Sequence, residues 1–374
     1  PYFKAKPLIE KYNVATFSSN YNLYGNLSWR VMETLRIVMG AENVEVYSVD
    51  EAFLNLDGFA TENLQQIGIN IRETVEQWTG IKVSVGVAPT KGLSKVANRL
   101  AKKHKLATGC VLVLDTREKI NKALQDTPIG EVWGVGRQYA QKLMDMNAVF
   151  TAFDLTKKTE EWANKNLGGV VGVRLIKELN GKPANTMKEE LTVKKMITTT
   201  RMFGSPVKNI NDIKEAIATY TSRSAEKLRK QQSAANIISV FVVPKEQNYN
   251  PYFRHEPTIS SYVTLPIATS ATNELIKPAL KLIDKLYEHG RLYKKAGVML
   301  SGLVPDANIQ GNLFVPNLNN DKRMLMSMLD NVNFAMRDDI VKFAASGIKR
   351  DWKMRQELRT PRYTTRWGEL SRVR

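Results

Sequence analysis

The sequence predicts an α+β protein with more than one domain, and three observations carry that prediction. Short runs rich in β-branched and aromatic residues alternate with helix-period segments over residues 21–115. A similar alternation, in the order βαββαβ, returns over residues 193–300. The stretch between them has helical patterns only, and 374 residues leave room for two to four domains.

The composition excludes several classes of protein. Apolar residues make up 43% of the chain, as in an ordinary folded protein, and no apolar run approaches membrane-spanning length, so no membrane partner is expected. Cys110 is the single cysteine, which rules out a disulfide framework and favours the cytoplasm. The formal net charge of +18 predicts a polyanionic partner, nucleic acid or an acidic membrane surface, and of these two we expect nucleic acid.

The most informative stretch is residues 44–57, VEVYSVDEAFLNLD, in which two apolar runs flank Asp50 and Glu51. The residue types predict two strands, and a sharp turn would bring both carboxylates to one end of the sheet. Two adjacent anions repel each other. A cation such as Mg²⁺ would remove that cost, because it binds carboxylate oxygens and shares its shell with substrate phosphates. The alternative is an ordinary solvated turn.

The elements around this hairpin complete the first α+β region. Residues 1–16 have no clear period, and Ser18-Ser19-Asn20 then offers a cap for a helix that continues to Gly40. A later strand carries Ser84 and Gly86, whose small side chains allow something to approach closely. The elements expected after the hairpin are a helix, a strand, a helix and a strand, over residues 63–78, 81–88, 93–104 and 111–114.

The helix expected over residues 93–104 carries a stripe of polar residues. Lys91, Lys95, Asn98 and Lys102 advance by four, three and four, so they share one helix face. Residues 91–105 contain six Lys or Arg and no acid. Lysines beside a carboxylate pair would hold the phosphates of a metal-bound substrate. The alternative is the solvated face of an amphipathic helix.

The middle of the chain is helical and contains the sequence VWGVGRQYAQKLMDMNA. Gly134 and Gly136 precede a helix expected from Arg137, and glycine lets backbone N–H groups approach a phosphate at a helix N-terminus. The pattern resembles the second half of a helix-hairpin-helix, which grips DNA backbone without reading sequence. The alternative is a plain turn. Helices continue over residues 153–179, and residues 179–190 have the composition of a linker.

The second half is expected to begin with a strand over residues 193–203 that carries Lys194, Lys195 and Arg201. A helix, two strands, a helix and a strand follow, over residues 211–230, 236–243, 258–265, 272–288 and 296–300. The order βαββαβ predicts a compact sheet with two helices on one side. The other face is free for a nucleic acid groove, and the three cations are expected to contact DNA.

The C-terminal part contains two further signals. A loop over residues 305–321 includes Gln310, Leu313 and Phe314, a polar lead and an apolar pair that suit insertion into a partner's pocket. The alternative is an anchor on its own domain. Residues 337–374 hold 11 Lys or Arg against 5 Asp or Glu, with aromatic residues interleaved, which suits nucleic acid or a docking surface.

Several of these stretches together resemble a known family. YSVDEAFLNL closely resembles the second catalytic motif of the Y-family translesion DNA polymerases. The segments FSSNYNLYGNLSWRVM, VGVAPTKGLSKVANRLAKK, VWGVGR, YKKAGVML, QGNLF and TPRYTTRWGEL fall in the order found in one bacterial branch of that family. The PRYTTR stretch favours this branch, which acts in the SOS response, and the resemblance covers essentially the whole chain.

The resemblance implies a polymerase right-hand architecture and a domain division. The expected parts are a remnant of the fingers, a ferredoxin-like palm, a helical thumb with the helix-hairpin-helix-like motif, a βαββαβ little finger, and a clamp-binding loop with a basic C-terminal region. Their expected bounds are residues 1–20, 21–115, 116–182, 190–304 and 305–374. The implied activity is error-prone synthesis across damaged DNA, in the bacterial cytoplasm at the nucleoid.

The resemblance also implies roles for single residues. Asp50 and Glu51 match the second and third catalytic carboxylates, which hold two Mg²⁺ ions. Lys102 matches a lysine that contacts the incoming deoxynucleoside triphosphate. Gly134, Gly136 and Arg137 match the thumb hairpin on primer-template DNA, and Gln310, Leu313 and Phe314 match a sliding-clamp-binding peptide. Further implied partners are a processed UmuD dimer and a recombinase filament.

One departure from the family pattern affects the expected activity. The family's first motif, with another essential Asp, lies before the stretch that matches Pro1, so we expect a fragment that holds two of three metal-binding carboxylates. A catalytically inactive DNA- and clamp-binding protein is therefore the alternative. A nucleotide cyclase also uses carboxylates and metal on a palm-like sheet, but the helix-hairpin-helix-like stretch and the long basic second half argue against it.

Overall fold

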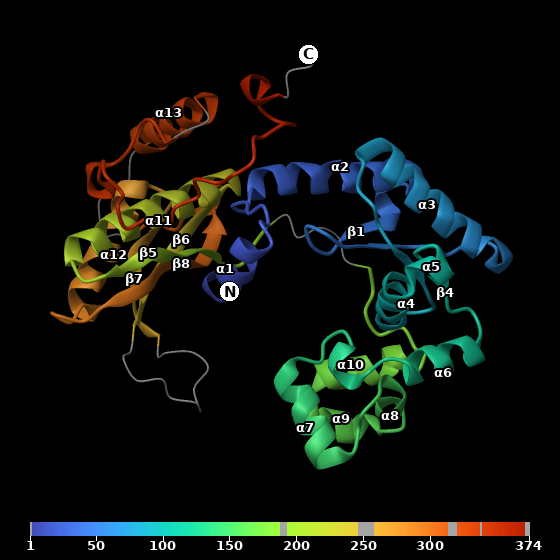
Figure 1. Cartoon of the computed structure of the whole chain (residues 1–374). Helices are drawn as coiled ribbons and strands as arrows, with labels where there is room; N and C mark the ends of the chain where they lie inside the picture. The colour runs from blue at the N-terminus through green and yellow to red at the C-terminus, as the bar shows by residue number, and fades with distance from the viewer. Residues whose placement is uncertain (1, 188–192, 246–257, 313–319, 337–338, 371–374) are drawn as a thin grey trace. The chain divides into compact units, whose positions relative to one another are not determined.

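The computed structural model describes residues 2–187, 193–245, 258–312, 320–336 and 339–370 (Figure 1). The chain divides into two compact units. One unit contains Pro1–Glu190 together with Leu358–Arg374, and the other contains Leu191–Glu357. The C-terminal end of the chain therefore returns to the unit in which the chain began. No described helix is both long and apolar enough to cross a membrane.

The first unit contains the predicted hairpin. Strands β1 (Val44–Val46) and β2 (Ala52–Leu54) pair in antiparallel fashion, with Val46 opposite Ala52. Strands β3 (Val85–Val87) and β4 (Val111–Val113) pair in parallel. All four strands are shorter than the sequence runs that predicted them, and in the described residues they form two separate two-stranded ladders.

The helices of this α+β region follow the predicted periods. Helix α2 (Tyr21–Met39) begins at the cap residue Asn20, whose side-chain oxygen accepts a hydrogen bond from the backbone N–H of Leu23. Helices α3 (Leu64–Thr79) and α4 (Lys91–Lys103) also form where expected. Helix α1 (Tyr2–Lys11) was not predicted, and it has Pro7 inside it and no buried residue, so its sequence carries no apolar period.

The described part of the first unit contains six further α-helices, and Gly168-Gly169 separates two of them. Their packing produces one apolar core, in which Leu124, Leu143 and Leu179 are fully buried. The helices are α5 (Lys105–Thr108), α6 (Arg117–Gln125), α7 (Arg137–Asn147), α8 (Ala152–Thr156), α9 (Glu160–Asn166) and α10 (Val170–Leu179).

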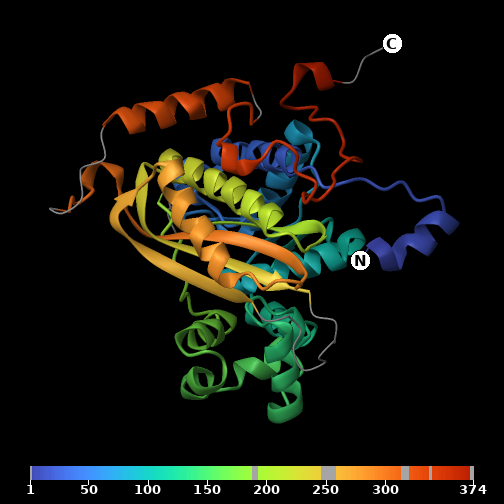
Figure 2. The ribbon, with the colours of Figure 1, turned by 90° about the vertical axis from the view of Figure 1, so that its left-hand side faces the viewer.

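The second unit confirms the order βαββαβ. Its antiparallel sheet has the strand order β5-β8-β6-β7, and helices α11 and α12 cover one face of it (Figure 2). The core lies between these helices and the sheet. The elements are β5 (Ile197–Val207), α11 (Ile210–Lys230), β6 (Ser233–Pro244), β7 (Ile259–Thr269), α12 (Thr272–Leu286) and β8 (Tyr293–Pro305).

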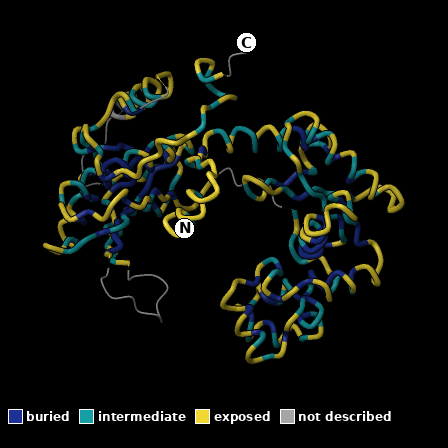
Figure 3. Tube along the Cα trace, viewed as in Figure 1, coloured by how far each residue is buried: buried dark blue, intermediate teal, exposed yellow. Residues whose placement is uncertain are grey.

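Helix α13 (Asn320–Ala335) follows in the second unit and was not predicted. Most of its described side chains are exposed, including Met324, Met328 and Phe334, whereas Met326 is buried. Figure 3 shows the contrast between this helix and the buried positions along the sheet. A helix that buries so little leaves no clear apolar stripe in the sequence.

The small residues predicted to allow a close approach do so. A Cβ atom at Gly86 would lie 2.1 Å from the backbone nitrogen of Asn98 and 2.5 Å from the carbonyl oxygen of Ser94, so α4 lies directly against β3. The side chain of Asn98 donates a hydrogen bond of 2.6 Å to the carbonyl oxygen of Ser84. This contact fixes where α4, and with it the lysine stripe, lies on the fold.

We expect Gly86→Val to destabilise the first unit by about 3 kcal/mol, because its side chain would push the backbone of α4 away from β3. Urea unfolding followed by circular dichroism would measure the change. The matched control is Gly25→Ala, since a Cβ there meets nothing within 4 Å. Gly25 is an exposed helical residue, so the control should gain about 0.5–1 kcal/mol. Equal stability of the Gly86 variant and the wild type would contradict the close approach.

Candidate active site

The turn between β1 and β2 presents both predicted carboxylates. The backbone N–H groups of Tyr47 and Ser48 each donate a 3.0 Å hydrogen bond to the carbonyl oxygen of Glu51, which closes the turn. The hydroxyl of Ser48 donates to a carboxylate oxygen of Asp50 at 2.5 Å. Asp50 and Glu51 are both exposed, so burial adds nothing to their mutual repulsion.

The lysine stripe of α4 lies against this hairpin. Lys95 forms an ion pair with Glu51, and Lys91 forms one with Glu45 on β1. The Lys91–Glu45 pair is buried, with side-chain exposures of 10% and 8%, whereas Glu51 is 44% exposed. Lys91 also donates to the carbonyl oxygen of Thr186 at 2.9 Å. The helix and the carboxylate turn are therefore held together at two successive turns of α4.

Lys102 lies farther along the same face, in the last turn of α4. Its side chain is exposed, and within the described residues it has no ion pair. Of the four polar residues of the stripe, two thus pair with the hairpin, one forms hydrogen bonds with Ser84 just before β3, and one faces solvent. The structure contains no group of three or more Asp, Glu, His or Cys side chains poised for a metal within its described part.

An aromatic cluster that the sequence did not predict joins the hairpin to the segment before α7. The ring centroids of Tyr47, Phe53 and Trp133 lie 5.4–5.8 Å apart. The indole N–H of Trp133 donates to the hydroxyl of Tyr47 at 3.3 Å. The ammonium groups of Lys91 and Lys95 lie 4.9 Å and 5.7 Å from the ring centres of Phe53 and Tyr47. Trp133 directly precedes Gly134, and this adjacency was the signal in the sequence that could have pointed to a functional role for Trp133.

The predicted glycine turn lies at the N-terminus of α7. Gly134 has a φ of +90°, a conformation that glycine adopts without strain, and Gly136 is the cap residue. No side-chain cap bonds the first N–H groups of α7, and a Cβ at either glycine would meet nothing within 4 Å. Arg137 is exposed at the first position of the helix. The turn is therefore open to an anion.

The three cations expected on the first strand of the second unit do not all lie on it. Lys194 and Lys195 precede β5, and Gln231 fixes the backbone of Lys194 through hydrogen bonds of 2.8 Å and 2.9 Å. Arg201 is opposite buried Ala296 on β8, which places it on the sheet face that carries α11 rather than on the open face. Burial and the neighbouring charges of Arg201 and Lys194 lower the pKa of Lys227 on α11. Three cations therefore gather at the β5 edge.

The predicted clamp-binding peptide is described only in part. Gln310 is exposed, two residues after the short 3₁₀ turn Asp306–Asn308. Leu313 and Phe314 lie outside the described residues.

Comparison with known proteins places the chain in a family. Residues 1–99 match the impB/mucB/samB family, residues 194–313 match the C-terminal domain of that family, and residues 323–373 match a domain of unknown function. The UmuC protein of Salmonella typhimurium is 37% identical over all of this chain and 87% of its own length. The MucB protein of Escherichia coli is 34% identical over 99% of this chain and 86% of its own.

A solved structure supports the fold independently. The Y-family DNA polymerase chimera Dbh-Dpo4(243-245)-Dbh superposes with a TM-score of 0.59 over 76% of this chain and 77% of its own, at 20% sequence identity. The DNA polymerase IV of Desulfatibacillum aliphaticivorans is 28% identical over 77% of this chain and 69% of its own. These comparisons confirm the resemblance to the Y-family polymerases that the motifs indicated. The chain belongs to the impB/mucB/samB family, and UmuC and MucB are among its relatives.

Proposed function

We propose that this chain is a DNA-directed DNA polymerase subunit that performs error-prone translesion synthesis in the SOS response. The proposal rests mainly on the β1–β2 turn, which presents Asp50 and Glu51 beside the lysines of α4. Relatives at 34–37% identity over almost the whole chain, and a polymerase fold in the matched structure, support the same activity. The resemblance of the motifs to the Y family supplies the error-prone character.

The residues at the turn suit divalent metal. Asp50 and Glu51 offer exposed carboxylate oxygens, the donor type that Mg²⁺ prefers, and Glu51 already has a cation beside it in Lys95. We infer that these two residues hold two Mg²⁺ ions, which when bound would activate the primer hydroxyl and stabilise the leaving pyrophosphate. Lys95 is then free to turn from Glu51 towards a phosphate oxygen, and Lys102 contacts the triphosphate from the exposed end of the same face.

No observation favours the alternative of a catalytically inactive DNA- and clamp-binding protein. The two ion pairs between the hairpin and α4, Lys91–Glu45 and Lys95–Glu51, support the catalytic proposal instead.

Two surfaces are proposed to hold primer-template DNA. The open turn at Gly134, Gly136 and Arg137 offers backbone N–H groups to a phosphate. Lys194, Lys195 and Arg201 gather cationic charge at the edge of the little-finger sheet. Both surfaces suit phosphate contacts, which do not depend on the base sequence.

The remaining partners and the location are proposals that rest on the sequence. We infer a sliding clamp as the partner of Gln310, Leu313 and Phe314, and a processed UmuD dimer and a recombinase filament as further partners. A nucleoid-associated location in a bacterial cytoplasm follows from work on chromosomal DNA.

Substitution at the turn tests the catalytic proposal. In the gene product that carries this sequence, Asp50→Asn and Glu51→Gln should each lower Mg²⁺-dependent primer extension by roughly 100-fold to 1,000-fold, because several kcal/mol of charge stabilisation is lost. Asp57→Asn is the matched control, since Asp57 is an exposed acid in the same region. Extension at the wild-type rate by the Asp50 variant would refute the assignment.

Salt dependence tests the DNA-binding surface. Changing Lys194 and Lys195 to Ala should lower the magnitude of the slope of log affinity against log salt by about 1.8, since each lost phosphate contact removes about 0.9. The control changes the exposed Lys281 and Lys285 on α12 to Ala, which removes the same net charge. Fluorescence anisotropy with a primer-template duplex gives the slopes, and equal slopes for the two double variants would rule out the proposed surface.

Retention on a sliding clamp tests the peptide. Changing Leu313 and Phe314 to Ala should abolish retention on the immobilised clamp of the same bacterium, because the proposed anchor loses its apolar side chains. Leu318→Ala is the control, since it removes an apolar side chain nearby in the sequence. Equal retention of the double variant and the wild type would count against the proposal.

A further inference from the structure

The C-terminal segment, residues 320–370, is the part of the chain for which the function proposed above has no role. It overlaps the match to a domain of unknown function over residues 323–373. Its contacts divide in two, because residues up to Glu357 belong to the second unit and residues from Leu358 belong to the first.

Trp352 anchors the segment in the apolar core of the second unit. Its side chain is 5% exposed, and its ring lies 6.3 Å from Phe203 of β5 and 5.8 Å from Tyr220 of α11, edge-on to both. Burial raises the pKa of Tyr220 to about 12, as expected for a phenol in a closed apolar contact. An indole at this position completes the core and is more than a surface contact.

The backbone beside Trp352 extends the edge of the sheet. The N–H of Gly204 donates to the carbonyl oxygen of Trp352 at 2.9 Å, and Phe203 pairs with Lys353 in an antiparallel bridge. A Cβ at Gly204 would lie 2.8 Å from the carbonyl oxygen of Lys353. Glycine at this position therefore allows the segment to lie directly against β5.

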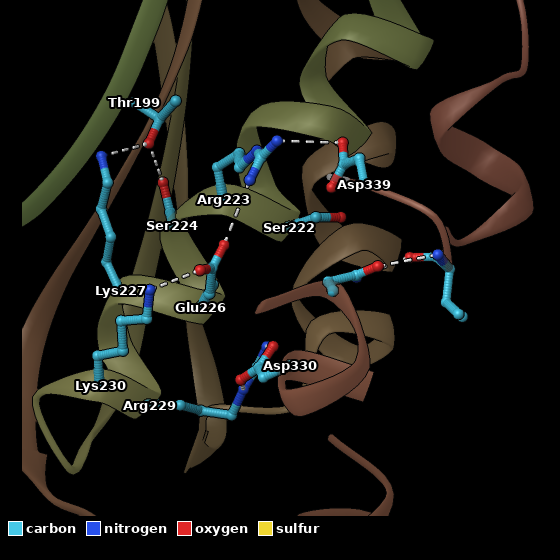
Figure 4. A network of polar contacts seen from close by, with 12 residues as sticks. Thr199, Ser222, Arg223, Ser224, Glu226, Lys227, Arg229, Lys230, Asp330 and Asp339 are labelled. Carbon is cyan, nitrogen blue, oxygen red and sulfur yellow. Dashed lines mark hydrogen bonds and ion pairs between the residues drawn. The ribbon is translucent and has the colours of Figure 1, made fainter. Parts of the chain in front are cut away.

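Ion pairs attach the preceding part of the segment to α11. Arg229 forms a two-pronged pair with Asp330 at 2.6 Å and 2.7 Å, with side-chain exposures of 13% and 19%. Asp339 pairs with Arg223 at 3.3 Å and with Arg350 at 3.0 Å. Figure 4 shows Arg223 directed at Asp339 and Arg229 beside Asp330. Planar two-pronged pairs of this kind fix orientation as well as position.

The first unit holds the end of the segment at the start of α2. The N–H of Ser18 donates to the carbonyl oxygen of Leu358 at 2.9 Å, and Ser18 forms a parallel bridge with Arg359. Asn20 is fully buried, and its amide nitrogen donates to the carbonyl oxygen of Thr360 at 2.8 Å and to the hydroxyl of Thr360 at 3.2 Å. The residue that caps α2 therefore also binds the C-terminal segment.

The connection between these two anchors is short. Met354–Glu357 are four exposed residues that separate Lys353 on the second unit from Leu358 on the first. Five peptide steps allow a distance of at most about 18 Å between the Cα atoms of Lys353 and Leu358. While Lys353 stays bound to the second unit and Leu358 to the first, the same distance limits how far these two sites on the units can separate.

We propose that residues 320–361 form a strap, a second covalent connection that limits how far the little-finger unit can move from the catalytic unit. The other connection runs through the linker near Glu190. A second short tether raises the effective concentration of each unit at the other and keeps both on one DNA molecule. The strap does not depend on catalysis, so a failure of the polymerase proposal leaves it testable.

Cutting the strap between its anchors is the direct test. The full chain would carry a specific protease site between Arg355 and Gln356 and spin labels at Gln77→Cys on α3 and Lys285→Cys on α12, in a Cys110→Ser background. Cleavage should broaden the distribution of label distances and extend it to longer values, because the limit on the distance between Lys353 and Leu358 is lost. Each unit should keep its thermal melt because each keeps its anchor. The control carries the site in the exposed His289-Gly290 turn. A distribution that stays unchanged after cleavage at Arg355 would overturn the proposal.

A substitution gives a second, independent readout. Gly204→Val should broaden the distance distribution of the uncut chain, because its side chain displaces the carbonyl oxygen of Lys353. Ser205→Val adds the same side chain to the same edge strand and should leave the distribution of the wild type unchanged. An unchanged distribution for both variants would also contradict the proposal. If Gly204→Val lowers the melting temperature of the second unit, the cleavage experiment alone decides.

Discussion

The arrangement of the candidate active site depends on the pairing of α4 with the β1–β2 hairpin, and its two ion pairs are not equivalent. The Lys91–Glu45 pair is almost fully buried, and removing one partner would leave an uncompensated charge at a cost of about 3–5 kcal/mol. Glu51 is 44% exposed, so its pair with Lys95 is worth at most about 1 kcal/mol. The buried Lys91–Glu45 pair therefore fixes the hairpin against α4. In the exposed pair, Glu51 can exchange Lys95 for another cation at little cost in free energy.

The same hairpin is coupled to the turn proposed to hold DNA. Trp133 packs on Tyr47 and Phe53, and the next residue is Gly134. Aromatic pairs of this geometry contribute about 0.5–1.5 kcal/mol each beyond the area that they bury. If DNA binding displaced the glycine turn, Trp133 would shift the hairpin residue Tyr47, which lies three residues before Asp50. This coupling runs through side chains within one unit and needs no movement of the other.

The sequence predicted the elements whose residues carry their own signals. The cap at Asn20, the small residue at Gly86 and the period of α4 are local features, and the structure has a helix start, a close approach and a lysine stripe at those places. It did not predict α1 or α13, because helices that bury few side chains have no apolar period. The Trp133 cluster and the burial of Trp352 arise from tertiary contacts between residues far apart in the chain.

Arg201 illustrates why the prediction of a strand does not by itself fix the face on which a side chain lies. Its place in a strand was predicted, but the side-chain face depends on the partner strand, and pairing with Ala296 puts it beside α11. The cations around α11 then divide by their partners. Arg223 and Arg229 are neutralised by Asp339 and Asp330 of the strap.

Lys194, Arg201 and Lys227 form no ion pair with an acid among the described residues. Burial and the repulsion from Arg201 and Lys194 lower the pKa of Lys227, although Glu226 acts in the opposite direction. Cations that repel one another at a sheet edge gain most from a polyanion, since each phosphate relieves that repulsion. The acids of the strap therefore neutralise Arg223 and Arg229 of α11. The positive charge that remains for nucleic acid lies at the edge of β5.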